Sequence, residues 1–410
     1  MTESAKGVEL ISSSLVSLGY SVRLRGFSAI DRYMGLPDLP FLEIETNADI
    51  AVLARFIENL RFPGANIADG AADTIDGTCY FHCIDDEVPK AEQDYYSFPL
   101  LSFSYDWQRK RFLDPLGVYP KLRALRDKQD YSFDENLWRS KTWQPKFGRY
   151  RAIMDAAMFV ARYGSDTLSQ KQAATGAAKH TIGALENCRS EATPSPEMQR
   201  VFLICLLVSP HPELGLGLLK HSGFLAELWP ELAAFDDVDH SKEFHPEGNV
   251  WNHTLETFRY RKSAASGAFD LRLSLALLLH DAGKPISASF GNHRFEGHAE
   301  LGARAAEKFL GRLGFSPSIT QEIFYLVRNH MLPAALKRLP LVKTAEIMAS
   351  PIFPTLMELY RCDESSSFKG LDGYYENSAA YQTYLKNLRN PYRTPDGKKL
   401  GKKQLHSIIN

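Results

Sequence analysis

The chain has 410 residues, of which 44% are hydrophobic and 24% are charged, and its formal net charge is −1. Length and composition are typical of an ordinary soluble globular protein with roughly two to four domains. The near-zero charge excludes an overall basic attraction to nucleic acid, so any RNA contact must come from local patches. The N-terminal residues have no signal-peptide pattern and no stretch reaches membrane-spanning length, so we expect a cytoplasmic protein without membrane contact.

Residues 1–125 are predicted to form an α/β head, because short segments rich in aromatic and β-branched residues alternate with helical patterns. Asn47 or Asp49 can cap the helix that follows the second strand. The expected helices are 7–18, 26–34 and a helix ending near 59, and the expected strands are 21–24, 41–44, 78–84 and 96–105.

The five cysteines are scattered and odd in number, which favours reduced thiols over a disulfide framework. Cys79, His82 and Cys83 form a small cluster. A zinc site would need a fourth ligand and a matching second cluster, and neither is evident. The alternating pattern around these residues favours a strand instead.

Residues 126–235 are expected to be a mostly helical body, with apolar helices at 151–163 and 198–208. Basic residues gather between 109 and 151, with Trp138, Trp143 and Tyr150 among them. Basic and aromatic residues together are what a protein would use to bind a single-stranded or tRNA-like RNA. The favoured alternative is a solvated surface above aromatic residues of the core. The basic residues are Arg109, Lys110, Arg111, Lys121, Arg123, Arg126, Lys128, Arg139, Lys141, Lys146, Arg149 and Arg151.

The chain is organised around residues 271–285, LRLSLALLLHDAGKP. The apolar run predicts a buried helix that ends on His280 and Asp281, and burying this pair is costly unless the two are paired or bind a metal. Gly283 and Pro285 are expected to stop the helix. Further histidines and an aspartate lie on neighbouring predicted helices, which suits ligands that project into a helical bundle. The candidate metal ligands are His253, His280, Asp281, His298, His330 and Asp363.

These residues resemble the HD superfamily of metal-dependent phosphohydrolases, in which His253, the His280-Asp281 pair and Asp363 match the family pattern. His298 and His330 resemble the additional ligands of its two-metal variants. The resemblance implies an all-α HD domain, placed at 236–370, followed by a basic tail at 371–410. Imidazole and carboxylate ligands suit one or two divalent ions, drawn from Mn, Fe, Co, Ni, Zn or Mg.

The rest of the chain resembles the tRNA CCA-adding enzyme and poly(A) polymerase family, in the bacterial branch that carries a C-terminal HD domain. The matching segments run to about residue 365. They are GYSVRLRGFSAIDRYMGLPD, FLEIETNAD, RFLDPLGVYPKL, the helical segment at 195–232 and HPEGNVWNHT. The fold class expected from both resemblances is α+β, with a nucleotidyltransferase-like α/β head followed by an all-α body and an all-α HD domain.

Several residues depart from that family where nucleotidyl transfer needs them. Phe41 and Glu43 stand where the resemblance places the two metal-binding carboxylates, and Phe27 replaces one glycine of a pair. Ile30 stands where an arginine is expected. The segment at 94–99 lacks the family's arginine and asparagine, and the segment at 148–152 lacks its acidic residues. We therefore predict a catalytically inactive head. The alternatives are a rearranged site that uses Glu43 and Glu45, or a solvated strand face bearing both glutamates.

The leading hypothesis is a metal-dependent phosphohydrolase that acts on nucleotides or RNA ends, with Asp281 and Lys284 as its catalytic residues. Lys284 could bind a non-bridging phosphate oxygen, or it could be only a cation favoured by the helix dipole. One rival is a tRNA nucleotidyltransferase of the CCA-adding or poly(A) polymerase kind. Another is an RNA-binding regulatory protein in which the metal is structural.

Overall fold

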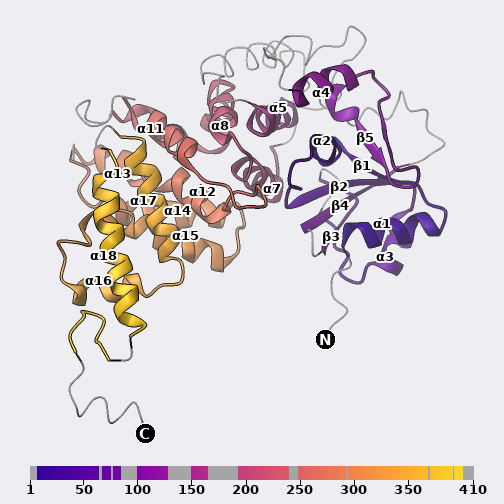
Figure 1. Ribbon diagram of the computed structural model, residues 1–410. Coiled ribbons are helices and arrows are strands. Elements are labelled where there is room, and N and C mark those ends of the chain that lie inside the picture. The colour runs from indigo at the N-terminus through magenta and orange to yellow at the C-terminus, as the bar shows by residue number, and fades with distance from the viewer. Residues whose placement is uncertain are drawn as a thin grey trace. The chain divides into compact units, whose positions relative to one another are not determined.

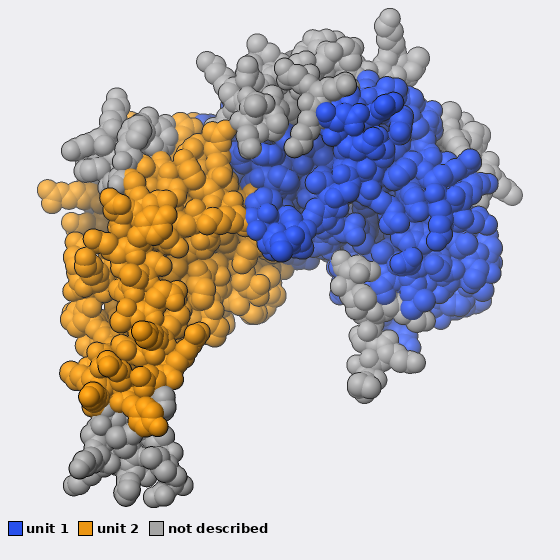
Figure 2. Space-filling model, viewed as in Figure 1, with its two compact units in different colours: residues 1–228, 263–269 blue, residues 229–262, 270–410 orange. Residues whose placement is uncertain are grey.

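The structure, a computed structural model, describes residues 7–63, 67–74, 77–84, 99–127, 149–164, 193–239, 248–291, 294–367, 370–390 and 392–399. The chain divides into two compact units, which are coloured separately in Figure 2. Unit 1 comprises residues 1–228 and 263–269, and unit 2 comprises residues 229–262 and 270–410. Within the described ranges, we find no helix that is both long and apolar enough to cross a bilayer.

Unit 1 contains a six-stranded mixed sheet in the order β3-β4-β2-β1-β5-β6. The neighbours β2 and β4 run parallel, and the other neighbouring pairs are antiparallel. Figure 1 shows α2 on one face of this sheet, and α1 and α3 on the other. The strands are β1 Val22–Arg25, β2 Phe41–Thr46, β3 Gly70–Thr74, β4 Gly77–Cys83, β5 Ser104–Asp106 and β6 Arg111–Leu113.

Alternation along β2 sorts its side chains onto two faces of the sheet. Leu42 and Ile44 are fully buried on one face, whereas Phe41, Glu43 and Glu45 project from the other. Asp49 caps α3 by accepting a hydrogen bond from the amide of Val52, one of the two caps expected from the sequence. The described helices of the sheet-containing part of unit 1 are α1 Val8–Ser17, α2 Gly26–Met34, α3 Ile50–Phe56 and α4 Tyr119–Arg126, with a 3₁₀ turn at Pro99–Ser102.

Helix α5 (Arg149–Tyr163) is held against the head by a buried polar contact. The Asp31 carboxylate of α2 accepts hydrogen bonds from Arg162 Nε at 3.0 Å and from the Tyr163 hydroxyl at 2.8 Å. Asp31 is completely buried, so these two donors replace the water that its carboxylate loses on folding. The remaining helices of unit 1 are α7 Pro196–Leu207, α8 Pro212–His221 and α9 Phe224–Leu228.

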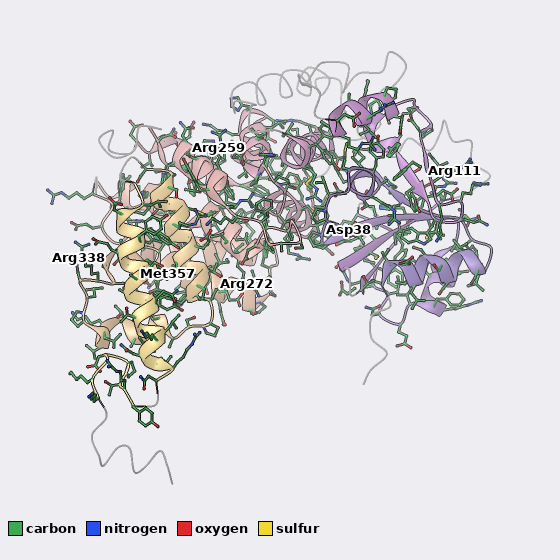
Figure 3. The ribbon with its side chains drawn as sticks, in the orientation of Figure 1. Asp38, Arg111, Arg259, Arg272, Arg338 and Met357 are labelled. Atoms are coloured by element: carbon green, nitrogen blue, oxygen red, sulfur yellow. The ribbon has the colours of Figure 1, made fainter. Side chains whose placement is uncertain are left out.

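Unit 2 is helical throughout its described elements, apart from isolated bridges. The central helix α12 begins at a cap in which the Asp270 carboxylate accepts hydrogen bonds from the amides of Arg272 and Leu273. The Arg272 side chain, labelled in Figure 3, forms an ion pair with Glu322 of α15. The helices are α10 Pro230–Ala233, α11 Val250–Thr257, α12 Leu271–Leu279, α13 Gly283–Ser289, α14 His298–Arg312, α15 Pro317–Asn329, α16 Leu341–Met348, α17 Phe353–Ser365 and α18 Asp372–Leu388, with 3₁₀ turns at Ala234–Asp237, Phe258–Tyr260 and Pro333–Ala335.

The predicted α+β fold class is confirmed, with a sheet in the N-terminal part and helices after it. The strand predicted through Cys79 and Cys83 is confirmed as β4. The expectation of one strand over 96–105 is wrong for its described part, because residues 99–102 form a 3₁₀ turn before β5. A separate body at 126–235 stays a prediction, and the boundary between the two units falls after Leu228.

Gly283 and Pro285 do not stop a helix, as the sequence suggested, but belong to the first turn of α13. Helix α12 ends at Leu279, and His280 and Asp281 lie in the short turn before α13. Proline is tolerated there because a first-turn amide has no intrahelical partner. Gly283 allows α13 to cross α14 closely, since a Cβ at this position would lie 1.9 Å from the carbonyl oxygen of His298.

Candidate metal centre

The structure brings the six predicted ligands together inside unit 2. His253 projects from α11, His280 and Asp281 come from the turn after α12, and His298 begins α14. His330 follows the last residue of α15, and Asp363 lies near the end of α17. Segments that are more than 100 residues apart in the sequence thus supply one cluster, and four of its members are nearly inaccessible to solvent.

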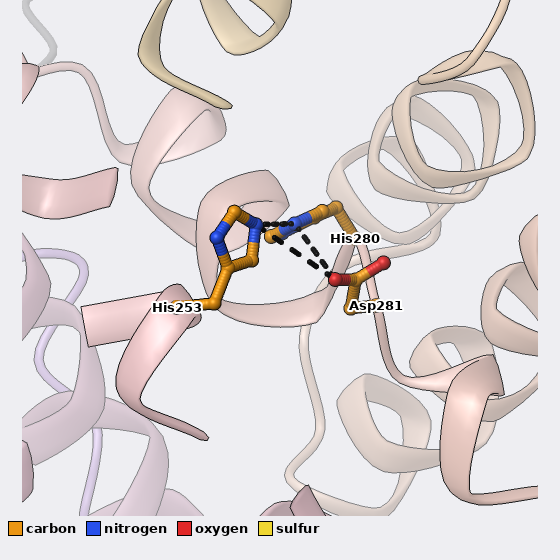
Figure 4. A group of neighbouring side chains, drawn as sticks. All are labelled: His253, His280 and Asp281. Carbon is orange, nitrogen blue, oxygen red and sulfur yellow. Dashed lines mark hydrogen bonds and ion pairs between the residues drawn. The ribbon is translucent and has the colours of Figure 1, made fainter. Parts of the chain in front are cut away.

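One group of ligands consists of His253, His280 and Asp281, which Figure 4 shows converging. The Nε2 atoms of the two histidines are 3.4 Å apart, and the Asp281 Oδ2 atom is 3.3 Å from His280 Nε2. Asp363 extends this group, with its Oδ1 atom 3.0 Å from His253 Nε2. The Asp363 side chain is 26% exposed, so this carboxylate lies on the solvent side of the group.

A second group consists of Asp281, His298 and His330. The Nε2 atoms of its histidines are 3.2 Å apart. The Asp281 Oδ1 atom lies 3.6 Å from His298 Nε2 and 3.9 Å from His330 Nε2. Asp281 therefore serves both groups, with Oδ2 directed at one and Oδ1 at the other.

Backbone carbonyl groups fix the orientation of three imidazole rings. The Nδ1 atoms of His280, His298 and His330 lie 2.9, 2.7 and 2.7 Å from the carbonyl oxygens of the residues three positions earlier. A carbonyl oxygen can only accept a hydrogen bond, so Nδ1 carries the proton and Nε2 presents its lone pair in each neutral ring. All three Nε2 atoms point into the cluster.

This convergence of lone pairs and carboxylates fits a bound cation. Lone pairs 3.2 Å apart repel each other unless positive charge lies between them. A transition-metal ion that holds imidazole nitrogens at about 2.1 Å keeps neighbouring ligand atoms roughly 3.0–3.4 Å apart, which matches the two spacings between histidine nitrogens, 3.4 and 3.2 Å. The donor set of histidine nitrogens and carboxylate oxygens suits a first-row divalent ion such as Mn, Fe, Co, Ni or Zn, and suits Mg less well.

Protonation states in the cluster are compatible with metal ligation. Burial lowers the pKa of His330 to about 4, and burial also lowers the pKa of His298, so both rings are neutral near pH 7. Burial alone would raise the pKa of Asp281, but its electrostatic interactions with His280 and Lys284 outweigh burial and hold that pKa well below its ordinary value. The pKa of Asp363 is also lowered, because its interactions with His253 outweigh its burial.

Lys284 lies at the edge of this cluster. Its Nζ atom donates a hydrogen bond to Asp281 Oδ2 at 2.7 Å, and its side chain is 14% exposed. Because Lys284 belongs to the first turn of α13, it is not the C-terminal helix cation that the sequence left as an alternative. The ammonium group orients Asp281 and places a positive charge beside both ligand groups.

The glutamates of β2 lie in ion pairs rather than on a freely solvated face. Glu45 is buried and pairs with Arg23 at 2.8 Å. Glu43 lies 3.7 Å from Arg25 Nε and 3.6 Å from an Arg151 guanidinium nitrogen. Burial alone would raise the pKa of Glu43, but Arg25 and Arg151 outweigh it and lower that pKa.

A small cavity lies beside Glu43. Its volume is about 110 Å³, and Phe27, Phe41 and Tyr80 are among its mostly apolar lining residues. The two phenylalanines that depart from the family pattern are thus walls of the cavity.

The proposed RNA-binding stretch is described only in part. Lys128, Trp138, Arg139, Lys141, Trp143 and Lys146 lie outside the described residues, as do Lys402 and Lys403 of the tail. Several of the described basic residues make ion pairs within unit 1, including Arg109 with Asp106 and Arg149 with Glu227. RNA binding through this stretch stays a prediction.

A family comparison identifies residues 250–357 as an HD domain. The match includes His253, His280, Asp281, His298 and His330, and it ends before Asp363. The chain therefore carries an HD domain, most of which belongs to unit 2, and the expected all-α character of this domain is confirmed.

Curated relatives include a CC-adding tRNA nucleotidyltransferase and multifunctional CCA proteins. The CC-adding tRNA nucleotidyltransferase of Thermus thermophilus is 32% identical over 204 residues, which cover 48% of this chain and 45% of that protein. The multifunctional CCA protein of Halorhodospira halophila is 30% identical over 233 residues, covering 54% of this chain and 49% of that protein. The chain thus spans about half the length of these relatives.

Among solved structures, the Bacillus stearothermophilus CCA-adding enzyme in complex with CTP covers 97% of this chain and 90% of its own. Its TM-score is 0.48 at 13% identity, and a likeness of this size assigns no function. The sequence relatives and the HD match together bear out the two resemblances found in the sequence, an HD domain joined to a chain related to CCA-adding enzymes.

Proposed function

We propose that this protein is a metal-dependent phosphohydrolase whose HD domain cleaves phosphoesters of nucleotides or RNA ends. The observation that carries the proposal is the convergence of four imidazole Nε2 atoms and two carboxylates in two groups that share Asp281. A divalent cation bound there would supply charge that polarises a phosphoryl group and lowers the pKa of water.

The residues of the chain have distinct roles in this proposal. His253, His280 and Asp363 would hold one ion, His298 and His330 would hold a second, and Asp281 would contact both. Lys284 would keep Asp281 in place and donate a hydrogen bond to a non-bridging phosphate oxygen. Asp281 and Lys284 are therefore the proposed catalytic residues.

We further propose that the head does not transfer nucleotides. Phosphoryl transfer by two ions needs carboxylates that face the metals, whereas both Glu43 and Glu45 are compensated by guanidinium groups. The Glu43 carboxylate also lies against the start of α2, since a Cβ on Gly26 would be 3.1 Å from its Oε2 atom. The protein's own anion thus fills the helix N-terminus, where phosphate would otherwise bind.

The second candidate is nucleotide addition to RNA, which the names of the sequence relatives favour. The two proposals are separated by assays on one preparation. Addition of CMP or AMP to an RNA primer in the presence of Mg would require Glu43 or Glu45, so it should disappear in Glu43→Gln or Glu45→Gln. Addition that is lost in these variants would refute the inactive head.

The hydrolase proposal is tested with chelator-treated protein, to which Mn, Ni, Co or Mg is added back. Substrates would be an aryl phosphodiester and 2′,3′-cyclic AMP. We expect metal-dependent turnover that is lost in Asp281→Ala and kept in Glu307→Ala, a control carboxylate that is exposed on α14. Folded protein without turnover under any metal would contradict the proposal for these substrates, and salt-sensitive RNA binding in its place would support the regulatory role.

A further inference from the structure

His253 is anchored differently from the other histidines of the candidate metal centre. Its Nδ1 atom lies 3.3 Å from the hydroxyl oxygen of Ser366, a side chain on another segment of the chain. His280, His298 and His330 each use a carbonyl three residues earlier. Ser366 is buried and immediately follows α17, the helix that carries Asp363.

The position of each ring in its helix explains the difference. His280 and His330 follow α12 and α15, and their Nδ1 atoms reach carbonyl oxygens of the last helical turn, for which the same helix offers no amide four residues later. His253 lies inside α11, where the carbonyls are engaged by amides four residues later. The Ser366 hydroxyl, 3.3 Å from the Nδ1 atom of this ring, comes from outside α11.

The Ser366 hydroxyl has a single proton, and its direction decides the tautomer of His253. The hydroxyl donates to the carbonyl oxygen of Asp363 at 2.7 Å. It can then only accept from the His253 ring, so Nδ1 carries a proton and Nε2 is left for ligation. His253 Nε2 is the atom that lies 3.0 Å from Asp363 Oδ1.

We infer that Ser366 is a positioning residue for the ion held by His253, His280, Asp281 and Asp363. Its hydroxyl couples the orientation of His253 to the end of α17, which carries Asp363, and so sets the spacing of two ligands at once. The inference rests on the proposed metal centre. It assigns to Ser366 a role that neither the HD match, which ends at residue 357, nor the sequence pattern contains.

The test is a titration of the full-length, chelator-treated protein with Co(II). Binding is measured by calorimetry and by the visible absorption of the bound ion. In Ser366→Ala we expect affinity at the His253 group to fall about 10- to 100-fold, while the His298 and His330 group is unchanged. Ser366→Thr, which keeps the hydroxyl, should restore binding. Ser365→Ala is the matched control, because among the contacts described that hydroxyl bonds only to the Arg361 carbonyl, four residues earlier.

A second measurement uses the wild-type protein, so it does not depend on whether a variant folds. Nitrogen-15 NMR of His253 in zinc-loaded protein should show a protonated Nδ1 and a metal-bound Nε2. Metal bound through Nδ1, or a Ser366→Ala titration identical to that of the wild type, would overturn the role of Ser366. Wild-type protein that binds no divalent ion would instead remove the proposed metal centre itself, and the two failures are thereby distinguished.

Discussion

Replacing Asp281 by Asn should abolish metal binding at both ligand groups, whereas replacing His298 by Gln should abolish it at one. The reason is the geometry of the Asp281 carboxylate, whose Oδ2 atom lies 3.3 Å from His280 Nε2 and whose Oδ1 atom lies 3.6 Å from His298 Nε2. An amide presents one oxygen and no charge. His298, in contrast, belongs only to the second group.

The expected magnitude follows from linkage between metal binding and folding. An ion present at one hundred times its dissociation constant stabilises the folded state by about 2.7 kcal/mol per site. Two occupied sites would therefore raise the free energy of unfolding by roughly 5 kcal/mol, and one site by roughly half of that. For a unit of this size, each kcal/mol raises the melting temperature by about 2–4 °C.

The assay is thermal unfolding of wild type, Asp281→Asn, His298→Gln and the control Glu307→Ala, each with chelator and with excess Zn or Mn. Comparing the metal-induced shift within each variant removes the cost of breaking the Lys284–Asp281 pair in the metal-free protein. We expect a full shift in wild type and Glu307→Ala, about half in His298→Gln, and almost none in Asp281→Asn. An Asp281→Asn protein that keeps half of the wild-type shift would refute the shared role of this carboxylate.

Three further predictions follow from contacts described above. Lys284→Met should lower turnover about 100-fold with metal stoichiometry unchanged, because it removes a donor to the phosphate; unchanged turnover in a steady-state assay would leave Lys284 a purely structural cation. Asp31→Asn should lower the free energy of unfolding in urea by about 3–5 kcal/mol, since Arg162 loses its buried partner, and a loss below about 1 kcal/mol would contradict this. His82 has a pKa lowered to about 3, chiefly by burial, so between pH 6.5 and pH 3 the unfolded chain binds the extra proton and stability falls as the pH falls. We expect wild type to lose about 2 kcal/mol between pH 7 and pH 5 through this residue, and urea unfolding of His82→Gln should show a correspondingly smaller loss.

The residues of the candidate metal centre could be picked out from the sequence because most of them are polar residues in or beside an apolar helix, where burial is costly. His280, Asp281 and His330 all follow buried runs, and burial of such groups demands partners. Their division into two groups could not be predicted. That division depends on the direction of each ring and of each Asp281 oxygen, which is decided by tertiary packing.

Two local signals were ambiguous in the sequence. Gly-Lys-Pro after a helix is compatible with its end and equally with the first turn of the next helix, and Gly283 proved to belong to the latter. Helix α18 was hidden in a stretch of weak apolar periodicity, because its buried positions are Asn377, Tyr381 and Tyr384 rather than aliphatic residues. Ser366 gave no signal at all, since one serine among several in SSS carries no pattern.

The close crossing at Gly283 determines how this site can vary. A Cβ at Gly302 of α14 would lie 2.9 Å from the Gly283 amide nitrogen, so main chain meets main chain on both sides of the crossing. The separation of the His280-Asp281 turn from His298 is consequently set by backbone thickness, not by side-chain volume. Substitutions elsewhere on α13 and α14 can reshape the surroundings of the site and change which molecules enter it. The distance between the His280-Asp281 turn and His298 stays the same.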